Sequence, residues 1–227
     1  MWIIGLTGAL GAGKSLVSSY FRYLGIPVHC SDEFIHFLFE KDQDVHKHIK
    51  RLWPDVIVKG KIDRSLLGEH VLFSPRDLRI LENLLYPKLA KNQKEFIKQN
   101  QKLKKKLVVL DVPLLFEVGL DTYCHDVIFV SAVPTLRKHR VLKRKGMTSR
   151  KFYAFEALQM KEREKKRKST FILYSGRDKG NVLKAIKKIV FYLSQRPIPQ
   201  WRGRWPDTLK RKRYESKSCL RHRNNWI

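Results

Sequence analysis

The sequence predicts an α/β fold in which helices flank a parallel sheet. Three observations predict it. An apolar run, Trp2 to Leu6, enters a glycine-rich loop, and a helix-like segment, 16–24, leaves that loop. Further apolar runs alternate with segments of helical period as far as residue 194. These later runs are short and nearly continuous, which is typical of strands buried on both faces.

The glycine-rich loop has the spacing G-x-x-x-x-G-K-S, from Gly8 to Ser15. A strand before such a loop and a helix after it are the setting of a P-loop, where backbone N–H groups and the helix N-terminus hold phosphates. The sequence therefore predicts a P-loop NTPase-type sheet. The residues expected to bind ATP here are Gly8, Ala9, Leu10, Gly11, Ala12, Gly13, Lys14 and Ser15.

Each residue type in the loop has its own expected task. Gly8, Gly11 and Gly13 permit a tight turn around an anion, because glycine reaches positive φ without a Cβ clash. Lys14 is expected to contact the β- and γ-phosphates, and the Ser15 hydroxyl to ligate Mg²⁺.

The remaining elements follow in chain order. Strands are expected at 26–30, 107–112, 126–131 and 170–174. Helices are expected at 32–40, 65–73, 78–101, 134–144, 149–168 and 179–194. Ser74-Pro75 is a helix start signal. We therefore expect a domain over 1–194, with a helical insert at about 42–106 and a polar lid at about 145–168, followed by a basic C-terminal tail, 195–227.

Composition narrows the ligand class. The chain has 227 residues, 43% of them hydrophobic, and a net charge of +27. Such a charge suits a polyanionic small ligand, nucleic acid or an anionic membrane surface. The cysteines, Cys30, Cys124 and Cys219, have no metal-site spacing and suggest no disulfide framework, which favours a reducing compartment. Neither a membrane span nor a signal peptide is indicated, and we expect a cytoplasmic protein.

Acidic residues lie at or after the ends of two expected strands, at the edge where parallel sheets bind ligands. Asp32 could accept the proton of an attacking hydroxyl or could cap a helix N-terminus. Asp111 could support Mg²⁺ through water or could be a buried acid bonded to the P-loop. Glu117 could reach an acceptor or cap the next helix.

Arginines gather around the polar segment 149–168. They could neutralise charge on a transferring phosphoryl group, or they could form a solvated face. They are Arg137, Arg140, Arg144, Arg150, Arg163 and Arg167.

The basic tail offers an alternative function. Trp201, Trp205 and Tyr214 lie near the run Lys210 to Arg213, and such aromatics could stack on bases. A nucleic-acid-associated P-loop protein is therefore one alternative. If the chain is an enzyme, we expect the tail to be dispensable for catalysis.

Four segments together resemble the dephospho-CoA kinase family, in order and spacing, from residue 1 to about 194. They are LTGALGAGKS, PVHCSDEF, KIDRSLLGEHVLF and LDVPLLFE. The resemblance implies ATP-dependent phosphorylation of the ribose 3′-hydroxyl of dephospho-CoA, the last step of coenzyme A synthesis, with Mg²⁺. A different nucleoside or nucleotide kinase is the alternative enzyme, but it would need another insert, and the PLLFE element argues against it.

The resemblance also implies residue roles. Asp32 would be the general base and Lys14 a second catalytic residue. Arg140 and Arg144 would lie near the phosphates of ATP. The residues implied to bind the acceptor are Thr7, Asp32, Arg64, Pro113, Leu114, Leu115 and Glu117.

The sequence departs from the family pattern in three places. Cys30 and His36 stand where the family has Asp and Arg, and Tyr86-Pro87 stands where it has His-Pro. Leu173-Tyr174 replaces an Asp-Asn pair that borders the nucleotide base. Because packing discriminates less than hydrogen bonding, we expect weak discrimination among purine donors.

Overall fold

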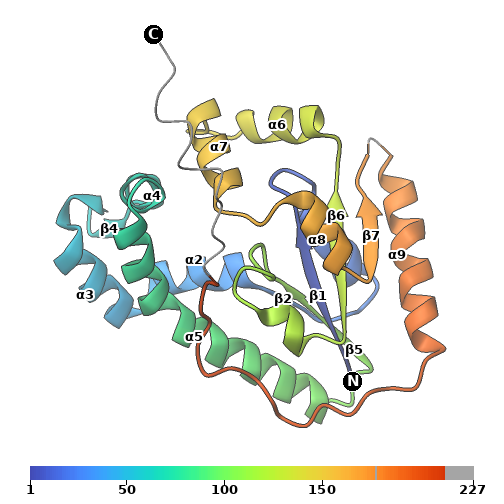
Figure 1. Ribbon diagram of the computed structural model, residues 1–227. Coiled ribbons are helices and arrows are strands. Elements are labelled where there is room, and N and C mark those ends of the chain that lie inside the picture. Colours follow the sequence, from blue (N-terminus) through green and yellow to red (C-terminus); the bar gives the residue numbers. More distant parts are fainter. Residues whose placement is uncertain (177, 213–227) are drawn as a thin grey trace.

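A five-stranded parallel sheet with the strand order β2-β5-β1-β6-β7 forms the centre of the molecule (Figure 1). The computed structural model describes residues 1–176 and 178–212. Its central strands are β1 (Trp2–Gly8), β2 (Val28–Cys30), β5 (Leu107–Asp111), β6 (Asp126–Ser131) and β7 (Phe171–Tyr174). The predicted fold class is confirmed, because each expected apolar run forms a strand of one parallel sheet.

The register of the sheet brings the expected site residues to one edge. Asp111 lies level with Leu6 of β1 on one side and with Cys30 of β2 on the other. Gly8 lies opposite Val130 of β6. The P-loop and the chain segments that carry Asp32 and Asp111 therefore leave the sheet together, at its carboxyl edge.

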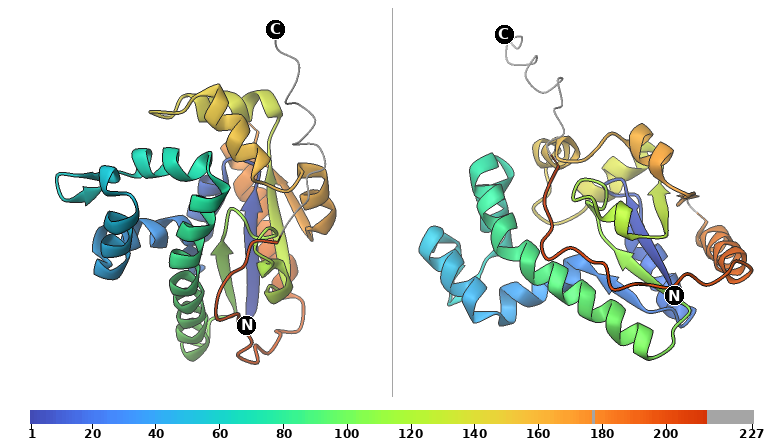
Figure 2. Two further views of the ribbon diagram at one scale, coloured as in Figure 1. Left: turned by 60° about the vertical axis from the view of Figure 1, so that its left-hand side comes forward. Right: turned by 60° about the horizontal axis from the view of Figure 1, so that its bottom comes forward.

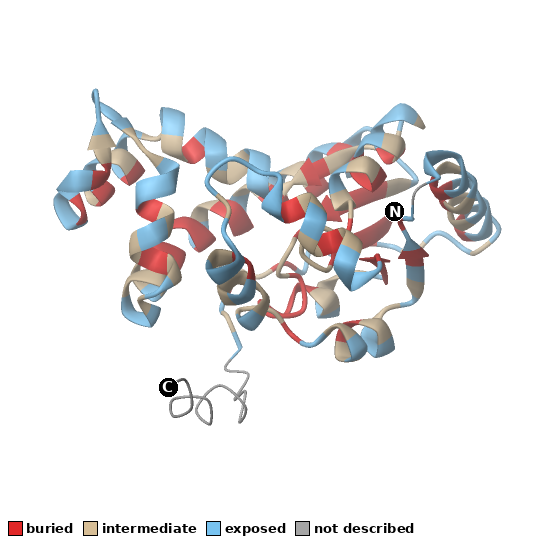
Figure 3. Cartoon of the chain, turned by 90° about the horizontal axis from the view of Figure 1, so that it is seen from above, coloured by how far each residue is buried: buried red, intermediate tan, exposed pale blue. Residues whose placement is uncertain are grey.

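Helices cover both faces of the sheet. On one face, α1 (Lys14–Tyr23) and α9 (Lys179–Ser194) bury Val17 and Ile186 against Ile4. On the other, α5 (Pro75–Lys102) and the segment that leads to η2 (Leu120–Tyr123) bury Leu89 and Phe116 against Ile3. Figure 3 shows buried residues concentrated in the sheet and on the sides of the helices that face it.

The insert has its own apolar core, formed around Ile49, Trp53, Leu67 and Leu85. This core is lined by α2 (Ser31–Lys41), which precedes the predicted insert. Within the insert it is lined by α3 (Gln43–Leu52), η1 (Pro54–Val56), β3 (Ile57–Val58), β4 (Lys61–Ile62), α4 (Arg64–Leu72) and the first half of α5. The expected helices are present, and Ser74 caps α5 by accepting the Asp77 N–H at 3.2 Å. The small β3–β4 hairpin is an addition that helical period did not predict.

The segment predicted as a lid contains two helices, so the single helix predicted over 149–168 is wrong. After α6 (Pro134–Leu142) come α7 (Ser149–Ala157) and α8 (Glu162–Lys168), joined by residues 158–161, which we call the lid hinge. The hinge holds neither Pro nor Gly. Instead the N–H of Met160 donates to Oε1 of Glu117 at 2.7 Å, and the Met160 side chain is buried. A tertiary contact thus overrides local helix propensity.

Residues 195–212 form an extended C-terminal strap that packs along α5 (Figure 2). Trp201, Trp205 and Leu209 are buried in the same cluster as the sheet. The hypothesis that Trp201 and Trp205 stack on nucleic-acid bases is therefore wrong, because both indole rings are inside the protein. Arg213 and Tyr214, which also belong to that hypothesis, lie outside the described residues.

Within the ranges that the structure describes, no helix combines the length and the apolar character needed to cross a bilayer.

Candidate functional site

The P-loop connects β1 to α1 with the backbone geometry of an anion-binding turn. Gly11 and Gly13 have φ of +76° and +87°, as predicted for glycine at these positions. Gly13 is the N-cap residue of α1, and no side chain caps that terminus. Gly8 differs, since it is not among the residues with positive φ. A Cβ there would lie 2.8 Å from the Val130 carbonyl oxygen, so close strand packing requires this glycine.

Lys14 and Asp111 form an ion pair beneath the loop. The other carboxylate oxygen of Asp111 accepts from the Ser18 hydroxyl, and the Asp111 side chain is buried. Asp111 is thus a hydrogen-bonded buried acid that holds the P-loop lysine, which is one of the two roles the sequence left open. Its support of Mg²⁺ through water stays a prediction, as does ligation by the exposed Ser15.

Asp32 lies on the first turn of α2, two residues after Cys30, the last residue of β2. The N-cap residue is Cys30 and no side chain makes a capping bond, so the capping hypothesis for Asp32 is wrong. The side chain is exposed to solvent, although protein atoms crowd around its carboxyl group. This crowding raises the pKa of the Asp32 carboxyl, and Lys14 and Arg144 partly offset the rise.

The arginines take three different positions. Arg140 donates from Nη2 to the Gly176 carbonyl at 3.0 Å and from Nη1 to Ser175 Oγ at 3.2 Å, beside the P-loop. Arg144 is exposed, and its charge acts on Asp32. Arg137 is buried and braced, because it donates to the Leu10 carbonyl at 3.2 Å and pairs with two glutamates.

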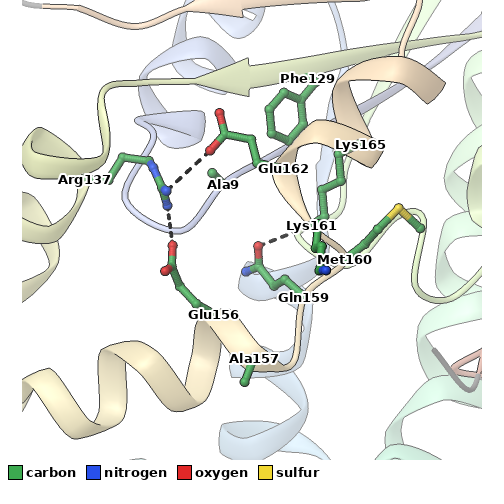
Figure 4. A pocket seen from close by; sticks show the side chains of 10 residues that line it. All are labelled: Ala9, Phe129, Arg137, Glu156, Ala157, Gln159, Met160, Lys161, Glu162 and Lys165. Carbon is green, nitrogen blue, oxygen red and sulfur yellow. Dashed lines mark hydrogen bonds and ion pairs between the residues drawn. The ribbon is translucent and has the colours of Figure 1, made fainter. Parts of the chain in front are cut away.

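Those two glutamates flank the lid hinge. Glu156 near the end of α7 lies 2.6 Å from Arg137, and Glu162 at the start of α8 lies 3.4 Å from it. Figure 4 shows this arrangement at a cavity of about 370 Å³ between Ala9, the Phe129 ring and the hinge. Arg137 therefore ties the P-loop to both helices of the segment predicted as a lid.

Thr7 and Leu115, both predicted to bind the acceptor, have buried side chains. Thr7 is inaccessible and donates from Oγ1 to the Pro113 carbonyl at 2.9 Å. Leu115 is also inaccessible and packs over Gly5. Burial contradicts a side-chain contact with substrate for both. Pro113 and Leu114 are half-buried and Arg64 is exposed at the start of α4, so their contacts with the acceptor stay predictions.

Glu117 faces the lid hinge instead of a cleft. Its Oε1 accepts from Lys165 Nζ at 2.7 Å as well as from the Met160 N–H. It caps no helix, since the residue before η2 is Gly119. Burial lowers the pKa of the Lys165 ammonium, and Glu117 partly offsets this. Sequence reasoning missed Lys165, because one lysine in a polar helix gives no signal of burial.

The donor-base prediction also needs correction. Leu173 is 2% exposed and packs in the core with Val182, so it cannot border a nucleotide base. Tyr174 is 65% exposed, and Ser175 and Gly176 meet Arg140 near the P-loop. The expectation of weak discrimination among purine donors therefore loses the part of its support that came from Leu173.

The first strand of the parallel sheet, whose order is β2-β5-β1-β6-β7, leads into the P-loop. The P-loop lysine, Lys14, pairs with the buried Asp111, and a second acid, Asp32, lies at the same edge of the sheet. This arrangement is that of a P-loop kinase. The comparisons give its family. The dephospho-CoA kinase profile matches residues 2–179. The chain is 34% identical over 190 residues to the dephospho-CoA kinase of Bartonella quintana, covering 84% of this chain and 97% of that protein. The dephospho-CoA kinase of Ehrlichia chaffeensis is 36% identical over 198 residues, covering 86% and 97%. This chain belongs to the dephospho-CoA kinase family.

Solved structures share the fold of this chain. The crystal structure of TT1252 from Thermus thermophilus matches with a TM-score of 0.70 and 32% identity, covering 85% of this chain and 97% of that one. The dephospho-CoA kinase of Campylobacter jejuni matches with a TM-score of 0.53 and 22% identity, covering 86% and 98%. A shikimate kinase from Acinetobacter baumannii, at a TM-score of 0.52 and 13% identity, covers 86% and 96%. The last two show a shared fold alone.

Proposed function

We propose that this chain transfers the γ-phosphoryl group of ATP to the ribose 3′-hydroxyl of dephospho-CoA, producing coenzyme A and ADP. Membership of the family supports the choice of substrates. The observation that carries the proposal is the electrostatic setting of Asp32, where Lys14 and Arg144 both act on a carboxyl at the mouth of the P-loop. The P-loop lysine and an exposed arginine thus act on the same carboxyl group.

The donor side of the proposed site consists of the P-loop and α1. The N–H groups at the uncapped start of α1 would hold the phosphates, with the partial positive charge of the helix behind them. Asp111 keeps the Lys14 ammonium at the loop. Arg140 would add a second cation near the phosphates.

The oxygen donors of the site fit Mg²⁺. Ser15 is exposed at the start of α1, and the Asp111 and Asp32 carboxylates stand at the same edge. Mg²⁺ takes a few protein oxygens and completes its shell with water and phosphate oxygens. Ser15 would hold the ion, and bound Mg²⁺ would supply positive charge against the negative charge that develops on the phosphates.

The acceptor side depends on Asp32. Its carboxylate would accept the proton of the ribose 3′-hydroxyl while that oxygen bonds to the γ-phosphorus and the bond to the β-phosphate oxygen of ADP breaks. Arg144 would neutralise negative charge on the phosphoryl group during its transfer. The raised pKa of Asp32 suits this task, because a base is most effective when its pKa lies nearer the working pH.

We also propose that the reaction takes place in the cytoplasm. Cys30 and Cys124 are free thiols among the residues that the structure describes, which suits a reducing compartment.

Mass spectrometry tests the function directly. The purified chain is incubated with Mg-ATP and dephospho-CoA, and coenzyme A is expected to form in step with ADP. Asp32→Asn serves as the matched control and should give at most about a hundredth of the rate. If a folded protein that binds ATP yields no coenzyme A, the proposed reaction is wrong.

A further inference from the structure

The lid hinge is held from two sides. From inside, Glu117 accepts the Met160 N–H. From outside, the end of the C-terminal strap reaches the same place. Nη2 of Arg211 donates to the Leu158 carbonyl at 3.4 Å, and the Lys212 N–H donates to the Glu117 carbonyl at 2.8 Å.

Arg211 also connects the hinge to α5. Its Nη1 lies 3.3 Å from Oε1 of Glu82, whose side chain is largely buried. The same carboxylate oxygen accepts from the Tyr86 hydroxyl at 2.8 Å. One guanidinium therefore spans a carboxylate on α5 and a backbone oxygen at the lid hinge, a geometry that a planar fork of donors permits.

The strap is anchored well before it reaches the hinge. The amino group of Met1 donates to the Pro199 carbonyl, and Gln101 of α5 donates to the Trp201 carbonyl at 3.3 Å. Trp205 and Leu209 are buried further along. The match to the family profile ends at residue 179, so this anchored segment lies outside the matched residues.

The hinge in turn connects to the P-loop. Glu156 and Glu162 stand on either side of it and both pair with Arg137, which donates to the Leu10 carbonyl. A shift at the hinge would therefore move the groups that brace the phosphate-binding loop.

We propose that the C-terminal strap is a working part of the enzyme and that Arg211 is a positioning residue, which sets the lid hinge against α5 for phosphoryl transfer. The proposal rests on the proposed kinase function. It replaces the expectation of a dispensable tail, because the strap closes a continuous set of contacts from α5 through the hinge to the P-loop. Small displacements of catalytic groups are costly, and a shift of about 1 Å can lower a rate about a hundredfold.

Three full-length variants test this. Arg211→Ala removes both contacts. Arg211→Lys keeps a charge near Glu82 but lacks the fork that spans to Leu158. Lys210→Ala removes a charge from the exposed neighbouring side chain. We expect kcat/KM to fall about ten- to a hundredfold in Arg211→Ala, to lie between the extremes in Arg211→Lys and to be unchanged in Lys210→Ala.

Hydrogen exchange separates positioning from general stability. In Arg211→Ala the Met160 amide should exchange at least about tenfold faster, while amides of β1 and β5 keep their rates. Equal loss of protection in those strands would reveal a merely structural role and overturn the proposal, as would wild-type kcat/KM in Arg211→Ala. If Arg211→Ala does not fold, Arg211→Lys is judged by the same criteria.

The readouts also separate the two proposals. If the wild-type chain makes no coenzyme A, the proposed function fails, and exchange at Met160 together with the Kd for Mg-ATP still tests the strap. Faster exchange with weaker Mg-ATP binding in Arg211→Ala would support a positioning strap, and unchanged values would overturn it.

Discussion

The ammonium nitrogen of Lys165 lies 2.7 Å from Oε1 of Glu117, and both side chains are 1% exposed. The pair joins α8 to the segment that follows β5. Desolvation of two charges is costly, so such a pair adds little net stability, but removal of one partner leaves an uncompensated charge inside the protein.

Lys165→Met should therefore be strongly destabilising. We expect the free energy of unfolding to fall by about 3–5 kcal/mol, as is usual when one partner of a buried pair is removed. Urea denaturation measures it. Lys166→Met is the matched control, since Lys166 pairs with Glu162 at a partly exposed site and should lose only about 0.3–0.5 kcal/mol.

A double variant checks the cause. In the double variant Glu117→Gln/Lys165→Met, the Met160 N–H keeps an acceptor and neither buried charge remains. Glu117→Gln combined with Lys165→Met should recover most of the lost stability. A double variant as unstable as Lys165→Met alone would show that lost packing, not the unpaired charge, dominates.

Asp32→Asn should separate activity from stability. Without a proton acceptor, kcat should fall about 10²–10⁴-fold. Because the folded protein raises the pKa of Asp32, it favours the protonated form, and the charged form at neutral pH weakens folding. The Tm of Asp32→Asn should therefore equal or exceed that of the wild type at pH 7. A lower Tm with normal turnover would remove Asp32 from the mechanism.

The same pKa shift predicts a pH dependence. The base works only when ionised, so kcat/KM should fall with falling pH at a midpoint above the ordinary aspartate value of about 3.9. Arg144 lowers the pKa of Asp32, so Arg144→Gln should move this midpoint to higher pH. Rate measurements across the acid range, with circular dichroism as the control for folding, test both. An unmoved midpoint in Arg144→Gln would contradict the proximity of the two charges.

Gly13→Ala should disrupt the phosphate-binding loop. Gly13 has φ of +87°, and an added Cβ would lie 2.9 Å from Ser175 Oγ. We expect Mg-ATP binding, measured by calorimetry, to weaken by at least about a hundredfold. Gly68→Ala is the matched control, since nothing lies within 4 Å of a Cβ added there on α4, and it should bind Mg-ATP normally. Normal binding by Gly13→Ala would rule out the P-loop as the nucleotide site.

Two serines on α1 should behave differently in a Mg²⁺ titration. Ser15 is exposed, whereas Ser18 is buried and donates to Asp111. Ser15→Ala should raise the Mg²⁺ concentration for half-maximal rate about tenfold and leave Tm unchanged. Ser18→Ala should lower the free energy of unfolding by about 1–3 kcal/mol, because a buried acceptor loses its donor. Equal Mg²⁺ requirements in Ser15→Ala and the wild type would exclude Ser15 as a ligand.

Features that depend on neighbouring residues could be predicted from the sequence. The P-loop lies within one short segment, so spacing alone indicates it. The bounds predicted for β6 and α9, 126–131 and 179–194, are those observed, because continuous apolar runs and helical period are local properties. Asp111 at the end of β5 and Asp32 after β2 could also be expected at one edge, because the carboxyl ends of parallel strands share it.

Only the tertiary structure decided which polar and aromatic side chains are buried. Glu117 and Lys165 are distant in sequence, and so are Met1 and Pro199, yet each pair meets in the fold. Whether a side chain is buried depends on a partner from a distant segment. The spacing of apolar residues within one segment does not identify that partner. The break at the lid hinge, the buried Leu173 and the strap against α5 all arise from such contacts, for this physical reason.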